Sequence, residues 1–488
     1  MRRKIQSQGI TFVRAASAVM VLAGIAAVVQ AAQPKAARRP NIVFIYTDDQ
    51  GPWALGASGN PQAKTPNLDR LFAEGAYLVN AFTSTPVCSP SRASLVTSRY
   101  GTELSITDYI NHRKEPELGL DPKTVTWPEV LAKAGYTTGL VGKWHLGVLD
   151  RFHPTRTGYQ YFTGFRGGGT RVKGATLEVD GQPKKFDGFT VNVLTEHAME
   201  FIRQNRRQPF LLSLHYRSPH EPWLPLPDED WAPFNNLDAK IPNPDFPYLK
   251  VDRMKRVMCE YLGSVASVDR NVGRLLELLD ELELADNTVV IFSSDHGYNV
   301  AHHGVQYKGN AVWMVTKLPP ATEYVPANRR PNMWDTSLRV PTAVRWPGVI
   351  RPGTVVSETL SNLDWYPTIL AMAGAKVPEG VLVRGRSFLP LLKGEKIPGW
   401  DNDLYAEYSM HHGAQTHMRM YRTPEWKLVR DFRDRGRDEL YHLEKDPAET
   451  TNLIRDPSPE VQRVVKTLHE KILAKMRKVN DPALELAR

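Results

Sequence analysis

The sequence has little cysteine and no long apolar run beyond its N-terminal segment. Its 488 residues include only 2 cysteines, too few for a fold built on disulfides. No stretch after residue 32 is apolar enough to cross a membrane, and internal repeats and low-complexity tracts are absent from the sequence. The 41% hydrophobic and 24% charged residues exclude disordered and fibrous classes and indicate a globular protein.

The chain also lacks a strong excess of charge of one sign. The formal net charge is +9, and it falls to +5 without residues 1–32, which contain four basic residues and no acidic one. So small an excess gives no reason to expect a nucleic-acid partner.

The first 32 residues follow the pattern of a secretory signal. Basic residues at positions 2–4 precede an apolar run at 15–29, and alanines follow at 31 and 32. Because the run is short for a bilayer span, we expect cleavage and a secreted or periplasmic protein without stable membrane insertion. An uncleaved anchor is the alternative.

Four apolar segments of the mature chain end at polar residues. We predict them to be strands, at residues 41–46, 138–142, 210–214 and 288–292. Helical patterns separate them, notably at 67–82 and 251–284. This alternation predicts an α/β fold, with a large mixed, mostly parallel β-sheet sandwiched by helices and a smaller C-terminal α+β domain.

The polar residues that follow these strands predict a functional cleft. They are Asp48-Asp49, Lys143-Trp144-His145, Ser218-Pro219-His220 and Asp295-His296. Functional groups gather beyond the carboxyl ends of strands in such sheets, so the four ends should face one cleft. We expect His215 and Arg217, which also follow the third strand, at the strand edge instead.

A composition change near residue 395 suggests two domains. We expect a catalytic domain at 38–395 and a small α+β subdomain at 396–488, with a strand at 426–429 and a closing helix near 459–477. Residues 312–332 have little periodicity and predict a long loop, which is often a site rim.

The acidic strand ends predict a metal site. Adjacent carboxylates such as Asp48 and Asp49 repel each other unless a cation or a proton neutralises them. Together with Asp295 they form an oxygen-rich set that suits calcium or magnesium. Either acidic pair alone could be a solvated turn, but both follow buried strands. His296 is a weaker calcium ligand and leaves the identity of the metal open.

A second candidate site begins at Cys88. Ser89 as N-cap and Pro90 at the first helical position predict a helix start. Cys88 would then lie beside backbone N–H groups that favour anions, and Arg92, one turn later, could hold an anionic centre. A buried structural cysteine fits the same spacing, and a Cys88–Cys259 disulfide is a further alternative.

Together these segments resemble the type I, formylglycine-dependent sulfatases of the alkaline phosphatase superfamily. Residues 88–97 resemble the family's Cys-x-Pro-Ser-Arg maturation signature. Other similar elements follow the family's order: Asp48-Asp49, Gly142-Lys143-Trp144-His145, Pro219-His220, Ser294-Asp295-His296-Gly297, Ser337-Leu338-Arg339-Val340-Pro341 and Glu439-Leu440-Tyr441-His442-Leu443. Each element alone is weak evidence for the family. Their occurrence together, in the family's order and over nearly the whole mature chain, makes the resemblance specific.

The resemblance implies hydrolysis of a sulfate ester, in a sulfated glycan or a small molecule. A maturation enzyme would oxidise Cys88 to formylglycine (3-oxoalanine), and Asp48, Asp49, Asp295 and His296 would bind Ca²⁺, or alternatively Mg²⁺, together with residue 88. One hydroxyl of the hydrated aldehyde would attack sulfur, and deprotonation of the other would expel sulfate. A plain cysteine has no second hydroxyl and could not turn over in this way.

The resemblance also implies roles for basic residues. Lys143 matches the cation that bridges the aldehyde hydrate and the sulfate, His145 the base, and His220 the general acid for the departing alcohol. Lys308 stands at the spacing of the family's sulfate-binding lysine. Arg330 is a second candidate for that contact, because the segment after residue 308 is longer than in the simplest members.

One departure from the signature and two alternative functions stay open. Ser98 stands where the signature has glycine, which would reduce maturation. A phosphodiesterase or phosphonate monoester hydrolase of the same superfamily would act on an ester of the same tetrahedral shape. A secreted glycan-binding relative without catalysis would keep the fold. Substrate discrimination is expected from loops at 166–169, 312–332, 411–412 and 433–437.

Overall fold

The computed structural model describes residues 39–319, 322, 325 and 328–487, so the predicted signal segment lies outside the described residues. Within that part of the chain, no helix combines the length and the apolar character needed to span a bilayer.

A ten-stranded sheet forms the centre of the fold and confirms the predicted α/β class. The strand order is β15-β2-β14-β9-β1-β8-β4-β5-β6-β7. Five parallel strands make its middle: β9 (Thr288–Ser294), β1 (Asn41–Thr47), β8 (Phe210–His215), β4 (Thr137–Lys143) and β5 (Tyr161–Phe165). The outer strands are β15 (Thr354–Val356), β2 (Ala76–Leu78), β14 (Ala343–Arg345), β6 (Thr176–Val179) and β7 (Gln182–Lys185). Both β14 and β6 run antiparallel to their neighbours, so the sheet is mixed.

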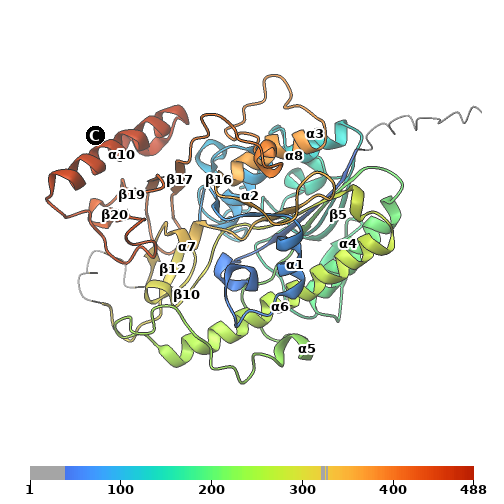
Figure 1. The fold of residues 1–488 in the computed structure, drawn as a ribbon, viewed down its shortest axis with the longest axis horizontal. Helices are drawn as coiled ribbons and strands as arrows, with labels where there is room; N and C mark the ends of the chain where they lie inside the picture. Colours follow the sequence, from blue (N-terminus) through green and yellow to red (C-terminus); the bar gives the residue numbers. More distant parts are fainter. Residues whose placement is uncertain (1–38, 320–321, 323–324, 326–327, 488) are drawn as a thin grey trace, which may run out of the picture. The chain divides into compact units, whose positions relative to one another are not determined.

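Helices cover both faces of the sheet (Figure 1). One face carries α1 (Pro66–Glu74), α4 (Thr190–Asn205) and α6 (Val251–Glu281), and the other carries α2 (Cys88–Thr97), α3 (Trp127–Lys133) and α8 (Trp365–Met372). Alternate side chains of β1 point to opposite faces. Val43 and Ile45 therefore pack with the first group of helices, and Ile42 and Phe44 with the second.

The helix predicted at 67–82 is shorter than expected. Helix α1 ends at Glu74, and the chain continues as strand β2. Gly75 explains the ending, because a Cβ atom there would lie 2.4 Å from the backbone oxygen of Val344 in β14. The backbone of Gly75 is extended, with φ at −124° and ψ at −151°, and its contact with β14 arises only in the folded chain, so the pattern of apolar residues does not reveal it.

The C-terminal region has its own antiparallel sheet. Its strands are β17 (Leu404–Tyr408), β18 (Met418–Arg422), β19 (Trp426–Asp431) and β20 (Glu439–His442). Helix α10 (Pro459–Lys478) buries Leu468, Ile472 and Met476 against this sheet. The smaller α+β region of the predicted fold is thereby confirmed, whereas its boundary near residue 395 stays a prediction.

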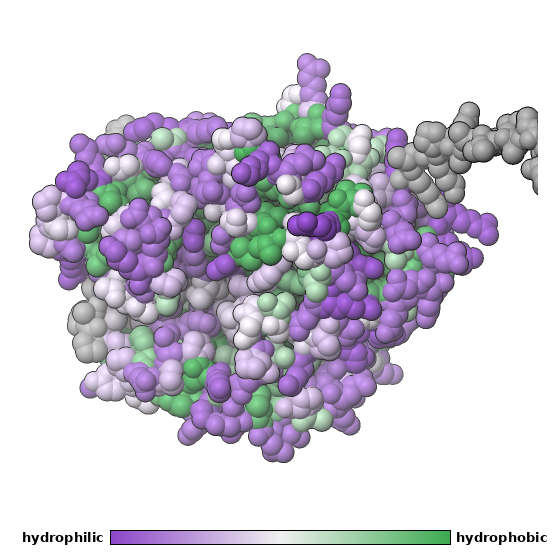
Figure 2. All heavy atoms as spheres, viewed as in Figure 1, coloured by the Kyte–Doolittle hydropathy of each residue, from purple (hydrophilic) through white to green (hydrophobic). Residues whose placement is uncertain are grey.

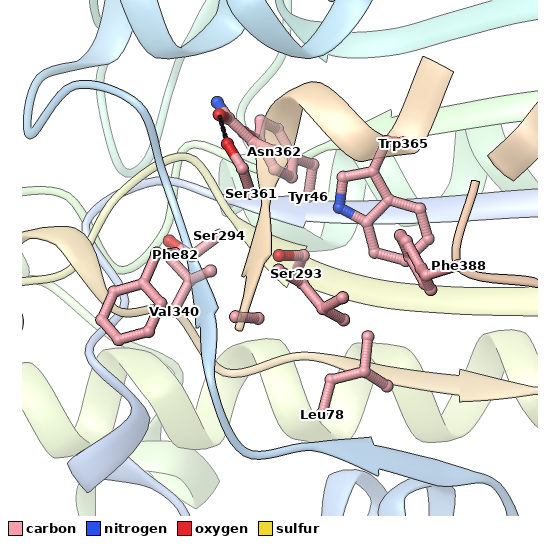
Figure 3. A pocket seen from close by; sticks show the side chains of 12 residues that line it. Tyr46, Leu78, Phe82, Ser293, Ser294, Val340, Ser361, Asn362, Trp365 and Phe388 are labelled. Carbon is pink, nitrogen blue, oxygen red and sulfur yellow. Dashed lines mark hydrogen bonds between the residues drawn. The ribbon is translucent and has the colours of Figure 1, made fainter. Parts of the chain in front are cut away.

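Neither the surface in Figure 2 nor the small enclosed space in Figure 3 offers an apolar binding site. The face in Figure 2 is mostly hydrophilic, with apolar residues in scattered patches. Figure 3 shows a space beside α8, walled largely by apolar side chains that include Leu78, Phe82, Trp365 and Phe388. Its volume of about 10 Å³ has room for about one water molecule, so it is too small for a substrate.

Candidate active site

The sheet brings the four polar strand ends together. Strands β9, β1, β8 and β4 are consecutive neighbours, and all four are parallel. Asp295 and Asp48 directly follow β9 and β1, Lys143 ends β4, and the segment after β8 leads to His220. Residues far apart in sequence thus reach one edge of the sheet.

Helix α2 places Cys88 at this edge. The helix starts at Cys88 with Val87 as N-cap, so the prediction of Ser89 as N-cap is wrong. Ser89 lies within the first turn, where its Oγ accepts a hydrogen bond of 2.9 Å from the backbone N–H of Ile110. Cys88 and Cys259 are both free, which excludes the disulfide alternative.

The Cys88 sulfur stands in for the oxygens that an oxidised residue 88 would carry. Its Sγ lies 3.4 Å from Lys308 Nζ, 3.4 Å from His296 Nε2 and 3.7 Å from Asp48 Oδ1. Burial would raise the pKa of the thiol, but Lys143 and Lys308 outweigh burial and lower this pKa to about 5. The surroundings therefore stabilise negative charge at residue 88.

Two buried lysines are paired with the two carboxylates that follow β1. Lys143 Nζ lies 2.6 Å from Asp48 Oδ2, and Lys308 Nζ lies 2.5 Å from Asp49 Oδ1. Burial alone would raise the pKa of Asp48, yet Lys143 in particular holds it well below its ordinary value. Burial raises the pKa of Asp49 to about 7 in spite of Lys308.

The same residues fit a hard divalent cation. Asp48, Cys88, Asp295 and His296 each offer a ligand atom, and these atoms lie within 4.8 Å of one another. His296 Nε2 is 3.2 Å from Asp295 Oδ1 and 3.4 Å from Asp49 Oδ1. Among the described residues, the buried Oδ2 of Asp49 has no hydrogen-bond partner. Three converging carboxylates with an unsatisfied oxygen are the donor set that calcium or magnesium prefers.

Arg92 lies behind this cluster. Its Nε and Nη2 atoms are 3.0 Å and 2.9 Å from Asp295 Oδ2, and its Nη1 donates to the backbone oxygen of Lys143 at 3.3 Å. The side chain is buried, and it contacts the carboxylate instead of lining the cleft. Arg92 therefore orients Asp295.

A cleft of about 520 Å³ opens onto the cluster. Five of the predicted site residues line it: Cys88, Asp49, His145, His220 and Lys308. Arg329, Gly168 and Gly169 also line it and belong to the predicted loops 312–332 and 166–169. Sequence reasoning missed the other lining residues, which are Tyr109, Ile110, Asn111, His112, Arg113, Glu221, Tyr307 and Asn310. Residues 109–113 follow no predicted strand and have no periodicity, so no signal in the sequence marked them.

Both predicted catalytic histidines face the cleft. His145 Nε2 lies 3.1 Å from the backbone oxygen of Ile110, while its Nδ1 has no partner among the described residues. Burial and Lys143 hold the pKa of His145 well below its ordinary value. His220 Nδ1 lies 2.6 Å from the backbone oxygen of Glu221, and its Nε2 is 3.7 Å from Asp49 Oδ2. Burial also lowers the pKa of His220.

The two candidates for sulfate contact lie in different places. Lys308 Nζ lies 3.4 Å from Cys88 Sγ. Arg330 pairs with Glu439 of β20, and its guanidinium lies 4.7 Å from the ring centroid of Trp334. The geometry thus favours Lys308 for a contact at residue 88.

Comparisons with known proteins agree with this geometry. A family model described as Sulfatase matches residues 40–375, and one described as N-sulphoglucosamine sulphohydrolase, C-terminal, matches residues 328–478. Steryl-sulfatase of Rattus norvegicus is 30% identical over 439 residues, which cover 73% of this chain and 70% of that protein. N-acetylglucosamine-6-O-sulfatase of Bacteroides thetaiotaomicron is 24% identical, with 92% and 89% covered. A solved structure of a protein in complex with its substrate D-glucosamine-2-N,6-O-disulfate has a TM-score of 0.77 at 22% identity and covers 91% of this chain and 99% of that one.

Proposed function

Because this chain belongs to the sulfatase family and hydrolyses sulfate esters, we propose that its substrate is a sulfated sugar. The cleft supports a sugar, since most of its lining residues, such as Asn111, His112 and Asn310, are polar. Two of the similar proteins named above also act on, or bind, sulfated glucosamine derivatives.

We propose that residue 88 acts in its oxidised, formylglycine form and that Asp48, Asp49, Asp295 and His296 hold calcium beside it. When bound, a divalent cation acidifies a coordinated hydroxyl and offsets negative charge on the sulfate. Arg92 keeps Asp295 oriented toward the ion through the contacts to Oδ2.

The basic residues around Cys88 would complete the reaction. Lys143 and Lys308 neutralise the charge that spreads over the sulfate oxygens as the bond between sulfur and the sugar oxygen breaks. His145 accepts a proton from residue 88, and His220 delivers one to the departing sugar oxygen. Over the whole reaction one water molecule is consumed, and the products are the free alcohol and sulfate.

The contact of Cys88 with Lys308, His296 and Asp48 at the floor of the cleft carries this proposal. We expect Cys88→Ala to abolish release of sulfate from sulfated sugars, with a melting temperature close to that of the wild type because Cys88 is part of the site and contributes little to the core. Full activity of this variant would contradict the proposal. Intact-protein mass spectrometry of the wild type checks the modification, because a thiol and an aldehyde differ in mass.

A phosphate ester is the competing substrate class. Matched aryl sulfate and aryl phosphate substrates separate the two activities, and we expect higher kcat/KM for the sulfate. Higher kcat/KM for the phosphate would favour the phosphodiesterase alternative.

We further propose that residues 1–32 are removed during export, which gives a secreted or periplasmic enzyme. N-terminal sequencing of protein recovered from the periplasm or the medium tests this step. Recovery with Met1 still in place would contradict cleavage.

A further inference from the structure

A second cavity adjoins the active-site cleft. Its volume is about 740 Å³, and its walls include Arg171, Lys185 and Arg217. Gly169 and Glu221 line both this cavity and the cleft, so the two spaces meet at these residues. A substrate bound at residue 88 could extend into this second space.

Arg217 is the buried cation of this cavity. It follows β8 and is only 3% exposed. Its Nε donates a hydrogen bond of 2.9 Å to the backbone oxygen of Thr170, whereas its buried Nη1 has no hydrogen-bond partner in the part of the chain that the structure describes. Burial lowers the pKa of Arg217 to about 10, so the side chain stays charged at neutral pH. A buried charged donor without an acceptor is costly, and an acceptor from a ligand would remove that cost.

The walls of this cavity carry more positive than negative charge. The carboxylates of Asp48 and Asp49 also act on Arg217, but they do not line the cavity and are paired with Lys143 and Lys308. Arg171 and Lys185 add two cations to the walls, against the single acidic residue Glu221. Glu221 already accepts a long hydrogen bond of 3.4 Å from Gln306. Arginine offers several N–H donors in a fixed plane, a geometry that matches sulfate and carboxylate oxygens.

We propose that this cavity is a subsite for a second anionic group, a sulfate or a carboxylate, that the substrate carries beyond the ester to be cleaved. Arg217 supplies the buried donor, and Arg171 and Lys185 supply charge at the walls. The expected substrate is therefore a sugar with at least two anionic groups. This inference rests on the proposed function, because it concerns the same bound sugar.

The test compares binding of monosulfated and disulfated forms of glucosamine, galactosamine and galactose. Titration calorimetry on the full chain with Cys88→Ala measures affinity without turnover. We expect at least one disulfated form to bind about tenfold more tightly than its monosulfated partner. Arg217→Gln and Arg171→Gln should each lower this ratio. Lys184→Gln is the matched control, because Lys184 lies on β7 over the ring of Phe186 and does not line the cavity.

Three results would overturn the subsite. They are a ratio near one for every sugar, an equal loss of affinity for both forms in Arg217→Gln, and an effect of Lys184→Gln as large as that of Arg171→Gln. If Arg217→Gln does not fold, Arg217→Lys keeps the charge without the planar donors and should still lower the ratio. A monosulfated uronic acid and its methyl ester distinguish carboxylate from sulfate. Failure of the proposed function would appear separately, as no release of sulfate by the wild-type enzyme.

Discussion

At the scale of single residues, Ser98 shows how the chain tolerates a departure from the family signature. Ser98 ends α2 in the left-handed conformation, with φ at 56°. A residue with a Cβ atom pays about 1–2 kcal/mol for this conformation, which explains why glycine suits the position. The Ser98 hydroxyl offsets that cost, because it donates to Leu363 O at 2.7 Å and accepts from the backbone N–H groups of Arg384 and Gly385.

Substitutions at Ser98 should separate these two effects. Ser98→Ala removes the hydrogen bonds of the hydroxyl but keeps the cost of the left-handed conformation. Ser98→Gly removes the same hydrogen bonds and also relieves that cost. We therefore expect Ser98→Ala to lower the free energy of unfolding by about 1 kcal/mol more than Ser98→Gly does. Urea denaturation of both variants measures the difference. A more stable alanine variant would contradict the role assigned to the backbone conformation.

The sequence predicted those site residues that belong to strand ends or to the signature, such as Cys88, His145 and His220. It did not predict residues 109–113. Their place in the cleft depends on contacts between distant segments, since Ile110 donates to Ser89 and its carbonyl oxygen contacts His145. These contacts arise from tertiary folding and leave no pattern in the local sequence.

At the scale of elements, a buried ion-pair network joins the C-terminal sheet to the rest of the fold. Asp335 begins α7 (Asp335–Leu338), and its carboxylate lies 2.9 Å from Lys427 Nζ and 3.1 Å from Arg422 Nη2. Lys427 also lies 2.6 Å from Glu449 Oε1. Burial would raise the pKa of Asp335, but Lys427 and Arg422 hold it well below its ordinary value. The network thus couples β18 and β19 to α7.

Asp335→Asn should weaken this junction. Removal of one partner from a buried ion pair lowers the free energy of unfolding by about 3–5 kcal/mol. Because Lys427 keeps Glu449 as a partner, we expect a loss near the lower value. Because the pKa of Asp335 is lower in the folded state, its stabilisation is present above the unfolded pKa of about 3.9 and is lost as pH falls. The difference in unfolding free energy between wild type and variant should therefore shrink below about pH 4.

A surface pair provides the control for this substitution. Asp150 pairs with Arg166, and the Asp150 side chain is 93% exposed. Because water screens an exposed pair, Asp150→Asn should lower the free energy of unfolding far less than Asp335→Asn does at neutral pH. Equal losses in the two variants at neutral pH would contradict the structural importance of the buried network.

At the scale of the whole molecule, the C-terminal region shares an apolar cluster with the rest of the chain. Phe82, Val87 and Met333 pack in one cluster with Leu404 and Val429 of the C-terminal sheet. A chain that ends at residue 395 would expose the first three side chains. Exposed clusters of this kind promote aggregation. We regard 396–488 as a subdomain that completes the core and does not fold separately.

Truncation tests that view. A chain of residues 33–395 should be insoluble or should bind a hydrophobic dye, whereas the control chain of residues 33–488 should be soluble and should not. Gel filtration and dye fluorescence measure the two properties. A soluble, monomeric 33–395 chain without dye binding would show that the C-terminal sheet is dispensable for folding.

The proposed metal should link catalysis and stability in the whole enzyme. The carboxylates of Asp48, Asp49 and Asp295 converge beside Lys143, Lys308 and Arg92, and Asp49 Oδ2 still has no hydrogen-bond partner among the described residues. A ligand that binds only the folded state stabilises it, by about 2.7 kcal/mol at a free concentration one hundred times its Kd. Chelation should therefore abolish release of sulfate and lower the melting temperature, and calcium should restore both. Magnesium at the same concentration serves as the comparison. Activity and melting temperature that both survive chelation would contradict a metal at these residues.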